Sequence, residues 1–150
     1  MRANGPYIFL SPEQVVQRAL ALTAIHPDDH VCVAGPDSLA AMLSLCRAGF
    51  QHVECARQAT CLGADDACDL LLVVGPMPPE ESAALIRRTA RLVRDGGRVA
   101  VQVADAAQHA AVSQALSAAG FGVDFSLFDR GSGKLVIHTL RRPAAARRAS

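Results

Sequence analysis

The sequence predicts an α/β fold: a mostly parallel sheet with helices on both faces and an antiparallel hairpin at its carboxyl-terminal end. Three observations favour this class. Short apolar runs alternate with helical patterns along most of the chain, as in strand–helix–strand units. Residues 69–74 are apolar after the first position, which is typical of a strand covered on both faces. The last two apolar runs are joined by a short segment with two glycines, which indicates a hairpin.

The first predicted element is a helix over residues 11–24. Ser11 is a good N-cap, Pro12 suits the first helical position, and polar residues follow in the first turn. Residues 1–10 precede this helix as an arm, and the last four of them are apolar or aromatic and able to dock on the body of the protein.

Residues 31–34 form the next predicted strand, a short apolar run that ends at Gly35-Pro36. Asp37 or Ser38 is a suitable N-cap for the helix that follows. A strand–turn–helix of this kind places backbone N–H groups at the carboxyl edge of a parallel sheet, where α/β proteins usually bind ligands. Gly35, Pro36, Asp37 and Ser38 are therefore the first candidate binding residues.

The remaining elements repeat the pattern. In order, they are strands at 51–55 and 69–74, a helix at 79–94, a strand at 98–103, a helix at 106–119 and hairpin strands at 121–128 and 135–140. Residues 56–68 carry only a strand-like stretch at 60–62 and a turn at 63–66. We expect a single domain over residues 1–140, followed by a flexible basic tail at 141–150.

Composition narrows the classes of function. The chain is 51% hydrophobic with a net charge of +1, so no strong field selects nucleic acid or a membrane surface. No apolar run approaches the ~20 residues that span a bilayer, and we see no signal peptide, so we expect a cytoplasmic protein. Lys134 is the only lysine beside many arginines, which we interpret as the codon bias of a GC-rich bacterium.

The cysteines and charged residues admit two interpretations. His52, Cys55, Cys61 and Cys68 could form a metal cluster, but they lack the CxxC spacing usual in zinc sites, so we expect reduced structural thiols and no metal. Asp105 suits a helix N-cap as well as a substrate contact. The arginines of the predicted 79–94 helix suit a solvated face, with an acidic partner as the alternative.

Several segments resemble the class I S-adenosylmethionine-dependent methyltransferases. The stretch from Gly5 to Val16, GPYIFLSPEQVV, is similar to the lead-in of small bacterial methyltransferases and of related protein-lysine methyltransferases. Residues 92–101, LVRDGGRVAV, resemble the segment that leads into the fifth strand of that family, and Ala119-Gly-Phe121 resembles the motif before its sixth strand. The resemblance implies a Rossmann-like fold and a site for S-adenosylmethionine.

The resemblance also implies which residues would hold that cofactor. Gly35 matches the first glycine of the family loop, Asp/Glu-x-Gly-x-Gly-x-Gly. Glu54 stands where family members use an acidic side chain on the ribose, and Asp65 or Asp66 where one lies near the adenine. Gly75 follows the strand that matches the family's fourth.

The sequence departs from the family at this site. Asp37 and Leu39 stand where the second and third glycines should be, and Val33 replaces the acidic residue. A Cβ at residue 37 crowds a ligand, and a carboxylate there faces the carboxylate of the cofactor's methionine. Thirteen residues between Cys55 and Asp69 leave little room for the helix and third strand that the family fits there, so we predict a sheet shortened between the second and fourth strands.

These departures predict a methyltransferase-like protein with an eroded S-adenosylmethionine site, a pseudoenzyme that serves as a binding or regulatory module. The alternative is an active S-adenosylmethionine-dependent methyltransferase that acts on a small molecule or a protein side chain. No catalytic residue can be named from the sequence. We expect a protein or small-molecule partner, no nucleic acid and no membrane, and a homodimer is one arrangement that the sequence allows.

Overall fold

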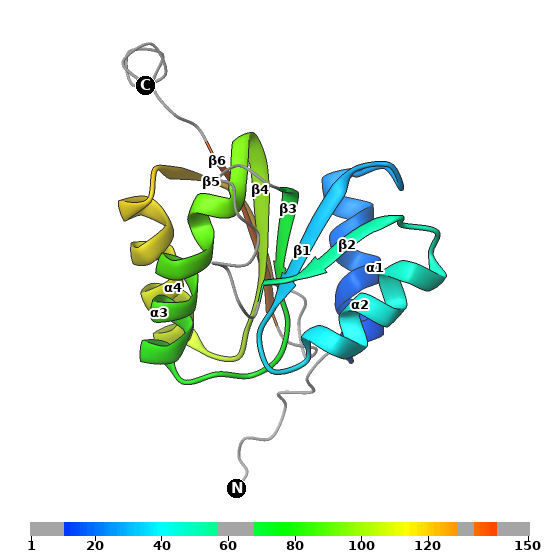
Figure 1. The fold of residues 1–150 in the computed structure, drawn as a ribbon. Helices are drawn as coiled ribbons and strands as arrows, with labels where there is room; N and C mark the ends of the chain where they lie inside the picture. The colour runs from blue at the N-terminus through cyan, green and yellow to red at the C-terminus, as the bar shows by residue number, and fades with distance from the viewer. Residues whose placement is uncertain (1–10, 57–67, 129–133, 141–150) are drawn as a thin grey trace, which may run out of the picture.

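In the part of the chain that the structure describes, six strands form one mixed sheet in the order β2-β1-β3-β4-β6-β5. The computed structural model describes residues 11–56, 68–128 and 134–140 (Figure 1). Strands β2, β1, β3 and β4 are parallel, and β6 pairs antiparallel with both β4 and β5. The strands are β1 (His30–Ala34), β2 (His52–Cys55), β3 (Cys68–Val73), β4 (Val93–Val103), β5 (Phe121–Phe128) and β6 (Lys134–Leu140). The predicted fold class, with its terminal antiparallel hairpin, is confirmed.

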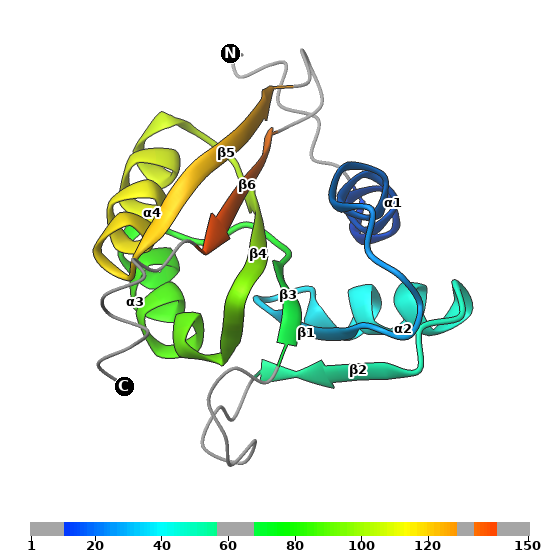
Figure 2. The same cartoon turned by 90° about the horizontal axis from the view of Figure 1, so that it is seen from above.

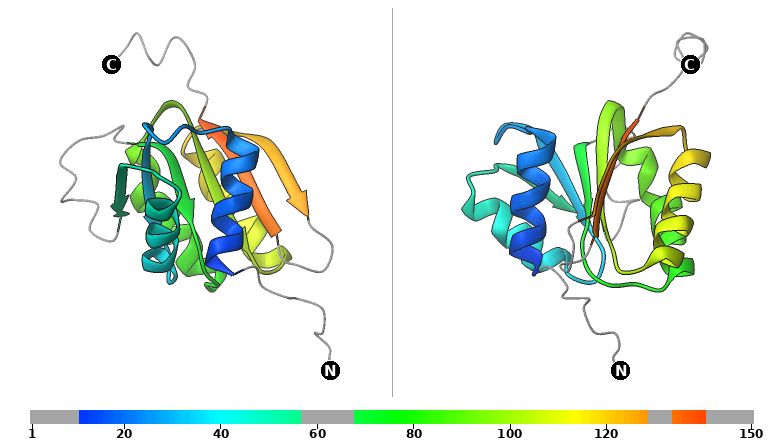
Figure 3. Two further views of the ribbon diagram at one scale, coloured as in Figure 1. Left: turned by 90° about the vertical axis from the view of Figure 1, so that its right-hand side faces the viewer. Right: turned by 180° about the vertical axis from the view of Figure 1, so that it is seen from behind.

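Two pairs of helices cover the two faces of the sheet (Figures 2 and 3). The helices are α1 (Pro12–Thr23), α2 (Ser38–Arg47), α3 (Pro79–Thr89) and α4 (Ala106–Ala118), with a short 3-10 turn η2 (Ala90–Leu92). Alternate residues of the central strands point to opposite faces, so the sheet separates two apolar clusters. One cluster joins the sheet to α1 and α2, and the other joins it to α3 and α4.

Strand β3 lies at the centre of this arrangement, between β1 and β4. Every residue from Leu70 to Val73 is at most 1% exposed. The only partly exposed position is Asp69, near the amino end of the strand. The predicted central, buried strand at residues 69–74 is therefore confirmed, one position earlier at each end.

Helix α1 begins as its sequence predicts. The Ser11 hydroxyl oxygen accepts from the Gln14 backbone N–H at 3.2 Å, and the Gln14 side-chain oxygen accepts from the Ser11 N–H at 2.9 Å. This reciprocal pair is a capping box, which satisfies two backbone donors that the first turn would otherwise leave without partners. The helix then turns a face with Val15, Val16 and Ala19 toward the sheet.

The predicted helix over residues 79–94 is wrong at its carboxyl end. Helix α3 stops at Thr89, η2 follows, and Val93 already begins β4 by pairing with Cys68. The next pair in the register is Leu70 with Arg98, so the chain bulges between Val93 and Arg98. Pairing with β3 overrides the local helical pattern. As a strand residue, Val93 is fully buried.

Some predicted features lie outside the described residues. These are the amino-terminal arm at 1–10, the strand-like stretch at 60–62, the turn at 63–66 and the basic tail at 141–150. Among the helices that the structure does describe, none combines the length and the apolar character needed to cross a membrane.

Candidate functional site

A cavity of about 420 Å³ opens at the carboxyl edge of the parallel strands. One wall is the turn between β1 and α2, with Gly35, Pro36 and Ser38, and Cys55 from the end of β2 lies beside it. The facing wall comes from α3 and the turn before it, and its members include Met77, Glu81, Leu85 and Arg88. Pockets of this size hold small molecules, and this edge is where α/β sheets usually bind them.

The turn after β1 is built on Gly35. Its φ of +100° lies in a region that side chains rarely adopt, and a Cβ there would stand 2.4 Å from the Val74 carbonyl oxygen. The close approach follows from the pairing of Ala34 with Val73, which brings the ends of β1 and β3 together. A glycine at residue 35 is thus required by the fold, whether or not a ligand binds.

Two backbone N–H groups of the turn donate hydrogen bonds to carbonyl oxygens of the protein itself. The Asp37 N–H donates to the Val74 carbonyl oxygen at 3.1 Å, and the Ser38 N–H donates to the Gly35 carbonyl oxygen at 3.2 Å. These two N–H groups are therefore not free to donate to a ligand. The reason is the turn itself, which folds back on the end of β3.

The Asp37 carboxylate lies against the next turn of the sheet edge. Asp37 is the N-cap of α2, but its side chain makes no capping hydrogen bond. Instead, its Oδ2 atom lies 3.1 Å from the place that a Cβ on Gly75 would take. A negative charge thus sits between the turns that follow β1 and β3. Residue 37 has a φ of −102°, so the observed turn tolerates a side chain there.

The other candidate residues lie at different depths around the cavity. Ser38 is buried, and its hydroxyl oxygen is 3.6 Å from the Cys55 sulfur. Glu54 is exposed on β2, opposite Cys32 in the register, and is not among the residues that line the cavity. Asp65 lies outside the described residues. The structure thus brings Gly35, Pro36 and Ser38 together at the cavity and places Asp37 and Gly75 against each other.

A buried polar network that the sequence analysis missed holds the same edge of the sheet. The Gln102 side-chain oxygen accepts from the Gly75 N–H at 2.9 Å. Gln108 donates from its side-chain nitrogen to the Ser82 hydroxyl at 3.0 Å and accepts from the Ala104 N–H at 2.7 Å. All three side chains are at most 2% exposed. A glutamine in the valine-rich β4 was the available signal, because buried amides need partners.

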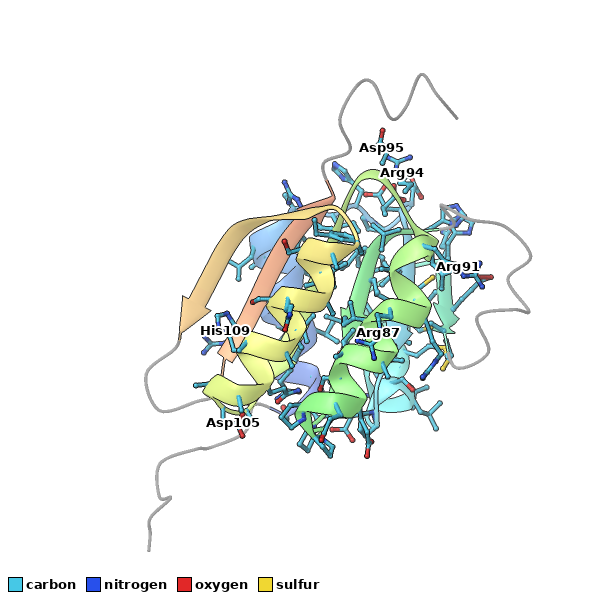
Figure 4. The ribbon with its side chains drawn as sticks, turned by 90° about the vertical axis from the view of Figure 1, so that its left-hand side faces the viewer. Arg87, Arg91, Arg94, Asp95, Asp105 and His109 are labelled. Atoms are coloured by element: carbon cyan, nitrogen blue, oxygen red, sulfur yellow. The ribbon has the colours of Figure 1, made fainter. Side chains whose placement is uncertain are left out.

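A second cavity, of about 170 Å³, lies at the opposite, amino edge of the sheet. Three charged side chains that line it, Asp69, Arg94 and Arg98, form ion pairs or hydrogen bonds within the chain. Arg94 forms an ion pair with Asp69 at 2.5 Å, Asp69 also accepts from the His30 N–H at 2.8 Å, and Arg98 donates to the Thr23 carbonyl at 2.8 Å. Figure 4 shows Arg94 and Asp95 at this end, with Asp105 at the other. We interpret this cavity as a structural feature of the β4 bulge rather than as a ligand-binding site.

The remaining sequence candidates have structural surroundings. Asp105 caps α4, because its Oδ1 atom accepts from the Gln108 N–H at 2.8 Å. Arg87 lies on α3 and Arg91 on η2, and both are exposed (Figure 4). Within residues 11–56 and 68–122, no group of three histidine, cysteine or acidic side chains is arranged to hold a metal ion. Cys61 of the metal-cluster interpretation lies outside the described residues.

Comparisons with solved structures show a shared fold. No family model matches the sequence, and no curated protein matches it either. Among solved structures, a ribosomal protein L11 methylase from Lactobacillus delbrueckii superposes with a TM-score of 0.62 and 14% identity, over 92% of this chain and 83% of that one. A SAM-dependent O-methyltransferase from Thermotoga maritima gives 0.60 and 16%, over 91% and 68%.

A longer neighbour matches over part of its length. The 16S rRNA N2 G1207 methyltransferase of T. thermophilus, solved with AdoMet and guanosine, gives a TM-score of 0.55 and 18% identity. The match covers 88% of this chain but only 39% of that one. At these identities the likeness shows the fold alone.

Proposed function

Because the chain has the fold of the class I S-adenosylmethionine-dependent methyltransferases, we propose that it is a relative whose cofactor site is closed and that it serves as a non-catalytic binding module. The observation that carries this proposal is the turn after β1. Its Asp37 N–H is bonded to Val74, and the Asp37 carboxylate occupies the space over Gly75.

The residues of this turn do not fit S-adenosylmethionine. The methionine end of the cofactor carries a carboxylate, which needs free N–H donors and a positive potential. The turn offers a like charge at residue 37 instead, and at a few ångström such repulsion is worth several kcal/mol at a partly buried site. Glu54 and Gly35 remain at the edge, but the Asp37 and Ser38 N–H groups are bonded within the chain.

The direct test is titration calorimetry of the purified protein with S-adenosylmethionine and with its demethylated product. We expect no heat and no thermal shift at millimolar ligand. Micromolar affinity for either would overturn the proposal. Reducing agent in the buffer prevents oxidation of the cysteines from contributing heat to the titration.

A repair experiment tests the contribution of the carboxylate to the closure, because a glycine at residue 37 keeps the backbone bond to Val74. The double variant Asp37→Gly and Leu39→Gly removes the carboxylate and restores backbone freedom, at a stability loss of about 1–2 kcal/mol. Leu39 is 60% exposed, so its loss leaves the core intact. We expect the double variant to gain measurable affinity for S-adenosylmethionine, and we expect Glu54→Ala to remove the gain. A folded double variant that still binds nothing would show that the pocket is absent rather than blocked.

A second candidate function is an active methyltransferase with an atypical loop, acting on a small molecule or a protein side chain. The observation in its favour is the cavity of about 420 Å³, which reaches Gly35 and Ser38 at the expected edge of the sheet. Transfer of a labelled methyl group to a protein or metabolite extract, lost in Glu54→Ala, would support this alternative.

A further inference from the structure

We propose that the cavity along α3 binds a small molecule made of a planar ring with one anionic group, and that Arg88 binds the anion. This inference rests on the proposed function, because it names the ligand class of the same non-catalytic module. It follows from the distribution of charge around the cavity, from the chemistry of its walls and from the position of Arg88.

The carboxyl edge of the sheet is acidic. Asp37 lies over Gly75, Glu54 is exposed on β2, and Glu81 lines the cavity near the start of α3. An anion entering at this edge meets like charge. The helix N-terminus that usually attracts anions there has its Asp37 and Ser38 N–H groups bonded to the chain itself.

The positive charge of the cavity lies further along α3, in the last turn of the helix. Arg88 lines the cavity seven residues after Glu81, which is about 10 Å along a helix axis. Arg88 has no hydrogen-bond or ion-pair partner among the residues that the structure describes. A guanidinium binds a carboxylate or phosphate through two parallel N–H groups, so it is well suited to fix one anionic group. Glu81 at the other end then sets the orientation of the ligand.

The walls between these two charges favour a flat ring. Ala84 and Leu85 of α3 supply apolar surface, and Met77 and Cys55 supply two sulfur atoms. Sulfur makes favourable contacts with aromatic rings, and methionine adapts its shape to them. None of the described residues that line the cavity is aromatic, so a ligand ring would not compete with a side-chain ring among them.

Arg87 provides a matched control for Arg88. Both arginines lie in the last turn of α3, where a cation stabilises the carboxyl end of a helix. Both are exposed, but only Arg88 lines the cavity. Figure 4 shows Arg87 on the outer side of α3, away from the sheet. Exchange of either arginine for glutamine therefore changes net charge and helix stability alike, and only one exchange changes the cavity.

The experiment measures binding of two probes to the full chain by ligand-observed NMR and calorimetry. Adenosine 5′-monophosphate carries the anion as a phosphate, and 2-naphthoate carries it as a carboxylate. Adenosine and 2-naphthalenemethanol are the uncharged counterparts. We expect at least one anionic probe to bind, its counterpart to bind at least tenfold more weakly, Arg88→Gln to weaken the anionic probe at least tenfold, and Arg87→Gln to leave it within twofold.

Further variants keep the result interpretable. Arg88→Lys should give an intermediate affinity, because it keeps the charge but loses the paired N–H groups. Ala84→Phe should fill the cavity and abolish binding while Arg88 remains. No binding of either anionic probe at 10 mM, equal loss in Arg87→Gln, or equal affinity for the uncharged counterparts would overturn the inference. Titration of S-adenosylmethionine in parallel separates the proposed function from the inference about Arg88. Tight binding of that cofactor would overturn the proposed function, whereas the absence of binding by any of the ligands would overturn only the inference about Arg88.

Discussion

At the scale of single residues, the edge of the sheet is fixed by two glycines and one aspartate. Gly35 allows β1 to end against the backbone of β3, and Gly75 leaves room for the Asp37 side chain. Asp37 then uses its own N–H to tie the two turns together. This tie is made by the backbone of residue 37, so it does not depend on the aspartate side chain.

A pair of glycine substitutions tests this description. Gly35 and Gly49 have nearly the same φ, +100° and +97°, but only Gly35 has backbone within reach of an added Cβ. Gly49→Ala should lose about 1 kcal/mol of unfolding free energy from its left-handed conformation alone. Gly35→Ala should lose at least about 3 kcal/mol, because the Val74 carbonyl must also move. Urea unfolding measures both, and equal losses would show that the close contact with Val74 is not maintained in solution.

At the scale of elements, the buried strand β3 dominates. It pairs with β1 on one side and β4 on the other, and its side chains enter both apolar clusters. No residue from Leu70 to Val74 is more than 1% exposed. The strand is therefore the element on which both halves of the sheet and both layers of helices depend.

A charge in this strand should unfold the protein. Leu72 is fully buried, so Leu72→Asp strands a carboxylate in the core, and we expect a loss of more than about 4 kcal/mol. Leu43→Asp is the control, because Leu43 of α2 is 50% exposed and its replacement should be tolerated. Circular dichroism during thermal unfolding compares the two. A cooperatively folding Leu72→Asp protein would contradict the central position of β3.

The elements differ in how far the sequence could predict them. Helix α1 and strand β3 have local signals, a capping box and an unbroken apolar run, and the structure agrees with both. The border between α3 and β4 has none, because residues 90–94 fit a helical period and only pairing with Cys68 turns Val93 into a strand residue.

The site shows the same limit. The sequence predicted that the turn at Gly35 lies at the carboxyl edge, and the register confirms that position. The bond from Asp37 to Val74 could not be predicted, because it joins segments that only the folded sheet brings together. The contribution of Met77 and Arg88 to the cavity depends in the same way on how α3 packs, and no local pattern encodes it.

At the scale of the whole molecule, the sheet divides the thiols by exposure. Cys32 and Cys68 are at most 2% exposed, whereas Cys46 lies exposed on α2. The neighbouring Cys32 thiol and burial together raise the pKa of Cys68 well above its usual range. Cys68 is therefore a poor nucleophile in the folded protein, since the thiolate is the reactive form.

Thiol labelling resolved by peptide mass spectrometry tests this division. A short pulse of iodoacetamide at pH 8 should modify Cys46 and leave Cys32 and Cys68 unmodified until denaturant is added. Elemental analysis of the same sample should find no zinc. Rapid labelling of Cys68 in the folded protein would show that the sheet opens locally, and one zinc per chain, lost on Cys55→Ser or Cys61→Ser, would reverse the interpretation of the cysteines as structural thiols.

The strand order has a consequence for the growing chain on the ribosome. β1 is made early, but its neighbour on the interior side is β3, which is not made until α2, β2 and residues 57–67 have followed. Until then the β1 residues Cys32 and Ala34, which belong to the cluster with α3 and α4, cannot be covered, and parallel pairings of this kind form slowly. The first third of the chain is therefore synthesised before its strand edges and one apolar face can be covered, and chaperones protect exposed segments of this kind.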